Sequence, residues 1–135
     1  MGNDNGKLKK AVERMNQKGL NGMIIYSGGT ASANRPSYLH YFSECKPLGP
    51  RNAAILSKSG EVALLVEPHW DSVRASKKSW IQDIRGTSDF MKDLRGILKE
   101  FKISGLIGLV GSKEMTQDIY AAIKKRAKSR EPIVS

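Results

Sequence analysis

The chain has 135 residues, of which 39% are hydrophobic and 27% charged, and these proportions indicate one folded domain and exclude a disordered chain. It carries 23 basic and 13 acidic residues, and the resulting net charge of +10 favours contact with anionic partners. The basic residues are spread along the chain, and aromatic residues make up only 7% of it, so a base-stacking surface for nucleic acid is not indicated. We therefore expect a single domain over residues 1–135 without specific affinity for nucleic acid.

The sequence gives no sign of a membrane or of an oxidising compartment. No apolar run approaches the roughly 20 residues of a membrane span, and the first residues lack the pattern of a signal peptide. Cys45 is the only cysteine, so no disulfide can form within the chain. We expect a cytoplasmic protein without membrane contact, in which Cys45 is a small and partly buried side chain.

The first half of the chain predicts a helix, a strand, a helical turn and a hairpin. Apolar residues recur at helical spacing before Gly19, and a short β-branched run follows them. A dense aromatic patch comes next, and then two apolar runs flank a turn in which Gly60 can take a positive φ. The predicted elements are a helix over 7–19, a strand over 22–27, a helical turn over 37–42 and hairpin strands over 53–56 and 62–66.

The second half alternates between helix and strand. The clearest element is an apolar helical stripe from Phe90 to Phe101, with Thr87 or Ser88 as its N-terminal cap. The predicted elements are helices over 69–78, 90–101 and 117–128 and strands over 80–84 and 106–110. The final apolar residues 132–134 resemble the start of a strand or linker, so we expect the native chain to continue beyond Ser135.

This order of elements predicts a three-layer α/β/α domain. Parallel neighbours in a sheet need crossover helices, whereas the hairpin contributes an antiparallel strand. The expected architecture is a mixed sheet of about five to six strands with helices on both faces.

The sequence contains no complete catalytic or metal-binding motif. His40 and His69 are the only histidines, and neither stands in a zinc-binding pattern. The three glycines of 105–111 match neither the dinucleotide fingerprint nor the phosphate-binding loop. The short match to S-x-x-K at 43–46 lacks the other serine-hydrolase motifs. We therefore expect no catalytic residue and no metal ligand set in this chain.

Four segments, in their order and spacing, resemble a known family. They are Leu-Asn-Gly-Met-Ile-Ile-Tyr-Ser at 20–27, Tyr-Leu-His-Tyr-Phe-Ser at 38–43, Arg-Asn-Ala-Ala-Ile-Leu-Ser at 51–57, and Gly-Glu-Val-Ala-Leu-Leu-Val-Glu-Pro at 60–68. This progression resembles the N-terminal domain of the creatinase, prolidase and aminopeptidase P family over nearly the whole chain. His40 and Tyr41 stand where Thr and Gly are usual in that family's second segment. The resemblance implies a ribonuclease H-like three-layer fold.

The resemblance also implies what the chain does and what it lacks. In that family a C-terminal "pita-bread" catalytic domain hydrolyses Xaa-Pro or related amide bonds, in most members with a pair of divalent metal ions such as manganese, cobalt or zinc. That domain is absent from these residues, so this chain alone would be inactive, whereas a full-length parent would be a metallopeptidase or related hydrolase. The expected partners are the chain's own catalytic domain and a second subunit, whose active site the N-terminal domain helps to shape. The substrate would be a peptide or a small amide.

Three residues are predicted to contact substrate in a neighbouring subunit. In creatinase-like members an arginine before the hairpin's first strand reaches the substrate carboxylate, and by position its counterpart here is Arg51. An arginine suits this role because guanidinium binds carboxylate bidentately. The alternative for Arg51 is an exposed charge at the start of a strand. His69 and Trp70 follow the second hairpin strand and could wall a neighbour's pocket. The alternative for Trp70 is the apolar face of the next short helix.

A second hypothesis from a different class is a free-standing basic module that binds an anionic partner. It predicts an affinity that falls steeply as salt rises.

Overall fold

A computed structural model describes residues 5–28, 38–45, 49–111 and 115–130. The helices are α1 (Asn5–Lys18), α2 (Tyr38–Ser43), α3 (Asp71–Lys78), α4 (Phe90–Glu100) and α5 (Gln117–Arg126). The strands are β1 (Gly22–Ser27), β2 (Asn52–Ser57), β3 (Val62–Val66), β4 (Ile84–Gly86), β5 (Gly105–Val110) and β6 (Ala127–Arg130). None of the described helices is long and apolar enough to cross a membrane.

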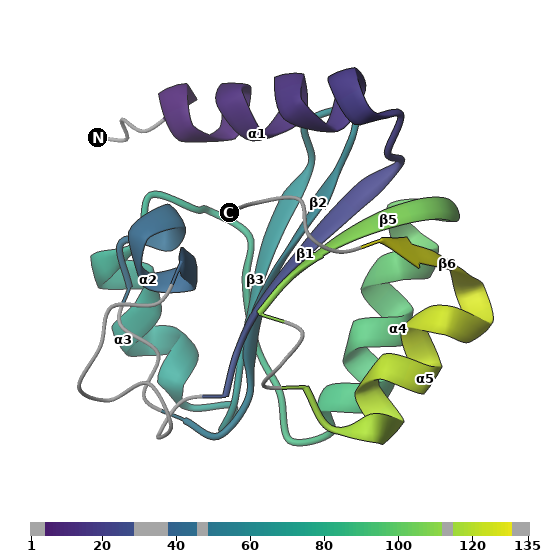
Figure 1. Ribbon diagram of the computed structural model, residues 1–135. Coiled ribbons are helices and arrows are strands. Elements are labelled where there is room, and N and C mark those ends of the chain that lie inside the picture. Colours follow the sequence, from purple (N-terminus) through teal and green to yellow (C-terminus); the bar gives the residue numbers. More distant parts are fainter. Residues whose placement is uncertain (1–4, 29–37, 46–48, 112–114, 131–135) are drawn as a thin grey trace.

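The six strands form one mixed sheet in the order β4-β3-β2-β1-β5-β6. Only β2 runs against its two neighbours, whereas the β1–β5, β3–β4 and β5–β6 pairs are parallel. Helices α2 and α3 cover one face and α4 and α5 the other, while α1 crosses one end of the sheet (Figure 1). The predicted three-layer α/β fold with a mixed sheet is confirmed.

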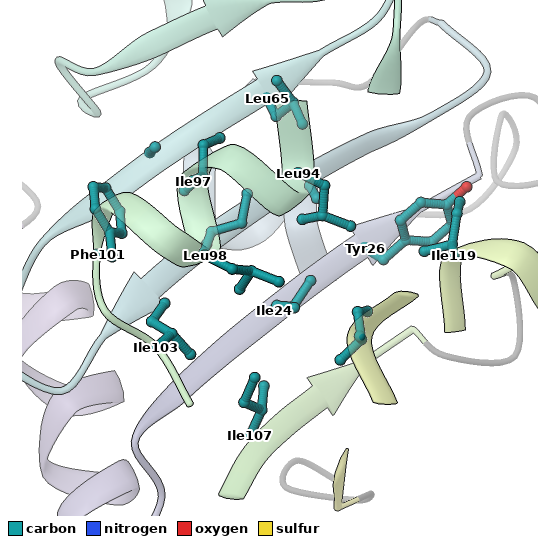
Figure 2. Close-up of a cluster of buried hydrophobic side chains, with 14 of the residues drawn as sticks. Ile24, Tyr26, Leu65, Leu94, Ile97, Leu98, Phe101, Ile103, Ile107 and Ile119 are labelled. Atoms are coloured by element: carbon teal, nitrogen blue, oxygen red, sulfur yellow. The ribbon is translucent and has the colours of Figure 1, made fainter. Parts of the chain in front are cut away.

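The face covered by α4 and α5 holds the larger of the two cores. Strand residues such as Ile24 and Leu65 point to this face, and α4 presents its whole apolar stripe to them (Figure 2). The stripe predicted from the sequence is buried throughout: Phe90, Leu94, Ile97, Leu98 and Phe101. Its cap is Asp89, whose side chain accepts a hydrogen bond from the Lys92 backbone amide, and not Thr87 or Ser88.

The opposite core lies under α1, α2 and α3. Met15 of α1, Phe42 of α2 and Ala75 of α3 meet the alternate strand residues, among them Ile25 and Leu64. Cys45 belongs to this core and is buried, as the sequence predicted.

Two predicted elements are wrong in their bounds. The strand expected over 80–84 begins only at Ile84, because Trp80 donates its Nε1 hydrogen to the Phe42 carbonyl and Ile81 packs into the core instead. The helix expected over 117–128 ends at Arg126, and its last two residues belong to β6, which pairs with β5 and was not predicted. The segment predicted over 132–134 lies outside the described residues.

Candidate functional site at the carboxyl edge of the sheet

The parallel strands β1, β3, β4 and β5 all end at one edge, which we call the carboxyl edge. It consists of the last residues of these strands together with the start of the antiparallel β2. The carboxyl ends of parallel strands are the usual place for ligand contacts in open α/β sheets. All three residues singled out from the sequence, Arg51, His69 and Trp70, follow or precede strands at this edge.

Arg51 is held by a bidentate ion pair with Glu67. Its Nε donates to Glu67 Oε1 and its Nη2 to Glu67 Oε2, both at 2.9 Å. The two residues extend the β2–β3 register by one step beyond the Asn52–Val66 pair, so they face each other across the hairpin. The hydrogen bonds that Arg51 donates to Glu67 raise the pKa of Arg51 above its ordinary value, so the guanidinium stays charged at every accessible pH.

An aromatic ring lies against this ion pair, and a second carboxylate acts on Arg51 electrostatically. The guanidinium carbon of Arg51 lies 5.4 Å from the centroid of the buried Phe90 ring, within cation–π range. Asp118, at the start of α5, has a pKa below its ordinary value, chiefly because the Thr116 hydroxyl donates to it and to a lesser extent because of Arg51. The carboxylates of Glu67 and Asp118 therefore both act on the Arg51 charge. The Nη1 atom of Arg51 makes no hydrogen bond with a described residue.

Close backbone contacts hold the segments of this edge together. A Cβ on Gly49 would lie 1.4 Å from the Glu67 carbonyl oxygen, and one on Gly86 would lie 1.9 Å from the His69 carbonyl oxygen. Both positions therefore require glycine for a steric reason. Nearby, the side chain of Asn52 is buried and donates to the Gly49 carbonyl, while its Oδ1 has no hydrogen-bond partner among the described residues.

His69 and Trp70 form the exposed entry to α3. Trp70 occupies the N-cap position without a side-chain capping bond, and 66% of its surface is exposed. Val73, one turn further along α3, is 62% exposed. Trp70 thus does not pack into its own domain as the apolar face of α3, and the buried face of this helix is formed by Asp71 and Ala75.

The edge brings the three predicted residues near one another in the fold without joining them in one cluster. Within the described residues, no hydrogen bond, ion pair or ring contact connects Arg51 with His69 or Trp70. Glu67 and Phe90, which hold Arg51 in place, were not predicted from the sequence. The register of the predicted hairpin was the signal that could have paired Glu67 with Arg51.

No group of three or more possible metal ligands occurs among the described residues. These residues therefore do not fit a divalent metal ion. Ser43 of the S-x-x-K match is buried, and its hydroxyl donates to the Leu39 carbonyl inside α2.

Comparison with known proteins identifies the family. The family model of the creatinase/prolidase N-terminal domain matches residues 7–134. The chain belongs to this family. No curated protein sequence matches the chain at a significant level.

Solved structures share the fold of this creatinase/prolidase N-terminal domain at low sequence identity. A Xaa-Pro dipeptidase from Bacillus anthracis matches 95% of this chain with a TM-score of 0.70 and 14% identity. A prolidase from Pyrococcus furiosus matches 93% with a TM-score of 0.69 and 21% identity. The N-terminal domain of a cytoplasmic peptidase from Mycobacterium tuberculosis matches 94% with a TM-score of 0.69 and 16% identity.

The matched regions differ in how much of each relative they cover. This chain spans 34% of the Bacillus protein and 35% of the Pyrococcus protein, but 92% of the Mycobacterium domain. The similarity therefore concerns the N-terminal domain alone.

Proposed function

We propose that this chain is the non-catalytic N-terminal domain of a cytoplasmic Xaa-Pro peptidase or related amidohydrolase. In this proposal a catalytic domain with a divalent metal pair, of manganese, cobalt or zinc, completes the protein and hydrolyses a peptide or small amide. The domain contributes to a homodimer and borders the active site of the neighbouring subunit. Family membership and the names of the structural relatives support the reaction class, and one relative is named as a cytoplasmic peptidase.

The single observation that carries the proposed role is the exposed Trp70 at the carboxyl edge. A tryptophan with two-thirds of its surface in water is a common anchor of protein interfaces, because it buries a large area when a partner covers it. His69 is exposed beside it, and Val73 continues the apolar surface along α3. We assign to this surface contact with the neighbouring subunit and its substrate.

Arg51 has a narrower part in the same proposal. Glu67 occupies Nε and Nη2, which leaves Nη1 for a carboxylate oxygen of the substrate. Phe90 and Glu67 fix the guanidinium plane, so little side-chain entropy is lost on binding.

Steady-state kinetics of the native gene product with a Xaa-Pro dipeptide and manganese test the proposal. Trp70→Ser is expected to raise KM by about ten-fold, because it removes one interface anchor. The matched control is Tyr41→Ser, which removes another exposed aromatic, 56% accessible, from a different helix and should leave KM unchanged. An unchanged KM in Trp70→Ser, or turnover by the isolated 135 residues, would refute the proposed role.

A further inference from the structure

A second surface lies between α1 and α2, away from the carboxyl-edge loop that carries Trp70. Figure 1 shows α1 crossing the end of the sheet above α2. A groove of about 640 Å³ opens here, and it involves none of the residues of the proposed active-site contact. Its lining residues are Lys10, Ala11, Glu13, Arg14, Gln17, Met23, Tyr38 and Tyr41. We call it the tyrosine groove.

The wall formed by α2 is aromatic and exposed. The rings of Tyr38 and Tyr41 are 5.6 Å apart and tilted by 34°, and 37% and 56% of the two residues is exposed. Burial raises the pKa of the Tyr38 hydroxyl, so this group is a neutral hydrogen-bonding group near neutral pH. Two adjacent exposed tyrosines offer a large contact area at a small cost in side-chain entropy.

The wall formed by α1 is basic. Lys7, Lys10 and Arg14 are spaced by three and four residues, so they follow one stripe of the helix. Over its whole length α1 carries five cationic residues, Lys7, Lys9, Lys10, Arg14 and Lys18, against the single acidic Glu13. The side chain of Lys10 makes no ion pair with a described residue.

One end of the groove is fixed by Lys7. Its Nζ donates to the Tyr41 carbonyl oxygen at 2.7 Å and to Glu44 Oε2 at 3.1 Å, and lies 4.4 Å from the Tyr41 ring centroid. Lys7 is therefore occupied in joining the two helices. The α1 wall of the groove includes Lys10 and Arg14, and the positive charge of Arg14 acts on the Tyr38 hydroxyl.

The floor of the groove is apolar. Ala11 and Met23 line it and belong to the core beneath α1. A ligand that fits this groove would carry negative charge for the α1 wall and a flat apolar side chain for the tyrosines and the floor.

We propose that the tyrosine groove binds an acidic peptide segment of a partner protein that carries an aromatic side chain. The net charge of the whole chain is +10, and this charge together with the excess of basic residues on α1 favours an anionic partner. The paired tyrosines favour an aromatic group. This inference is independent of the proposed peptidase role, since it needs neither a catalytic domain nor the carboxyl edge. Glu13 is the one acidic residue among the described residues that line the groove, so removing its charge should strengthen the binding of such a ligand.

Fluorescence anisotropy with the purified chain and a labelled peptide, Glu-Glu-Phe-Glu-Glu, tests the groove at low and at physiological salt. Binding should weaken about five- to ten-fold in Tyr41→Ala and about two- to five-fold in Lys10→Gln, as expected for an aromatic anchor and a rim charge. Glu13→Gln should strengthen it about two- to five-fold. Lys99→Gln is the matched control, because it removes the same charge from an exposed position of α4 on the other side of the sheet and should leave the affinity nearly unchanged.

Amide chemical shifts of the isotope-labelled chain then locate the peptide. Changes confined to α1 and α2, together with weaker binding of a peptide in which alanine replaces phenylalanine, would support the groove. The inference is overturned if the peptide fails to bind at low salt or if Lys10→Gln and Lys99→Gln lose the same affinity for it. It is also overturned if single-stranded RNA binds the chain more tightly than the peptide does. Each of these outcomes leaves the kinetic test of Trp70 unaffected.

Discussion

Replacing Gly86 by alanine should destabilise the domain by disturbing the start of α3. The new Cβ would lie 1.9 Å from the His69 carbonyl oxygen, about 1 Å inside the 3.0 Å limit that real Cβ atoms respect. The backbone fixes the position of the new Cβ, and the His69 atoms that it meets are backbone atoms, so no rotamer change can relieve the overlap. We expect a loss of about 3 kcal/mol, the upper part of the range for overpacked sites.

Urea denaturation followed by far-UV circular dichroism measures this loss. With an m-value of about 1–3 kcal/mol/M for a domain of this size, the midpoint should fall by about 1–3 M. Gly96→Ala is the matched control, because Gly96 lies inside α4 with nothing within 4 Å of an added Cβ. That variant should gain about 0.5–1 kcal/mol from helix propensity. Equal midpoints for Gly86→Ala and the wild type would refute the packing of His69 against β4.

Three further predictions concern the core, the cysteine and one surface network. Leu98→Ala should cost about 2–5 kcal/mol in urea denaturation, whereas Val73→Ala on the exposed face of α3 should stay within about 0.5 kcal/mol; similar losses would contradict the assigned core. Burial raises the pKa of the Cys45 thiol, so its reaction with Ellman's reagent should be slow in the native chain and fast in urea; a fast native reaction would contradict its burial. The hydrogen bond from Arg85 lowers the pKa of Glu100 below its ordinary 4.5, so the stability this adds is complete above that pH and is lost as pH falls through the lowered value. Glu100→Gln should therefore flatten the acid limb of the stability profile, and an unchanged limb would exclude this contribution.

Helix α4 and the β2–β3 hairpin could be predicted from the sequence because their patterns and their burial agree. Every residue of the α4 stripe packs against the sheet, so helical periodicity and tertiary contacts indicate the same element. In the hairpin, Gly60 takes a φ of +99° at the turn, as its sequence context requires. The segments are correct here because local preference and tertiary packing coincide.

Strands β4 and β6 could not be placed in the same way. Trp80 and Ile81 have the composition of a strand, but they pack into the core without pairing, and the ladder with β3 starts at Ile84. Residues 127–130 are largely polar and basic and show no strand pattern. Their strand is defined by backbone pairing with β5 at the sheet edge, and side-chain periodicity carries no signal for that.

The candidate site was predictable in part. The resemblance drew attention to Arg51, but only the hairpin register shows that Glu67 faces it, and only the tertiary packing places Phe90 beneath its guanidinium. For Trp70 the sequence left two alternatives open, an outward-facing wall and a buried helix face. The choice depends on which side of α3 faces the sheet, and Asp71 and Ala75 occupy that side.

The most direct test of the proposed role is a photo-crosslink from position 70 in the native gene product. A benzoylphenylalanine in place of Trp70 should, on irradiation, join two subunits and double the apparent mass, with the crosslinked peptide in the catalytic domain of the neighbour. A crosslink confined to residues of its own N-terminal domain, or no crosslink at all, would contradict the account.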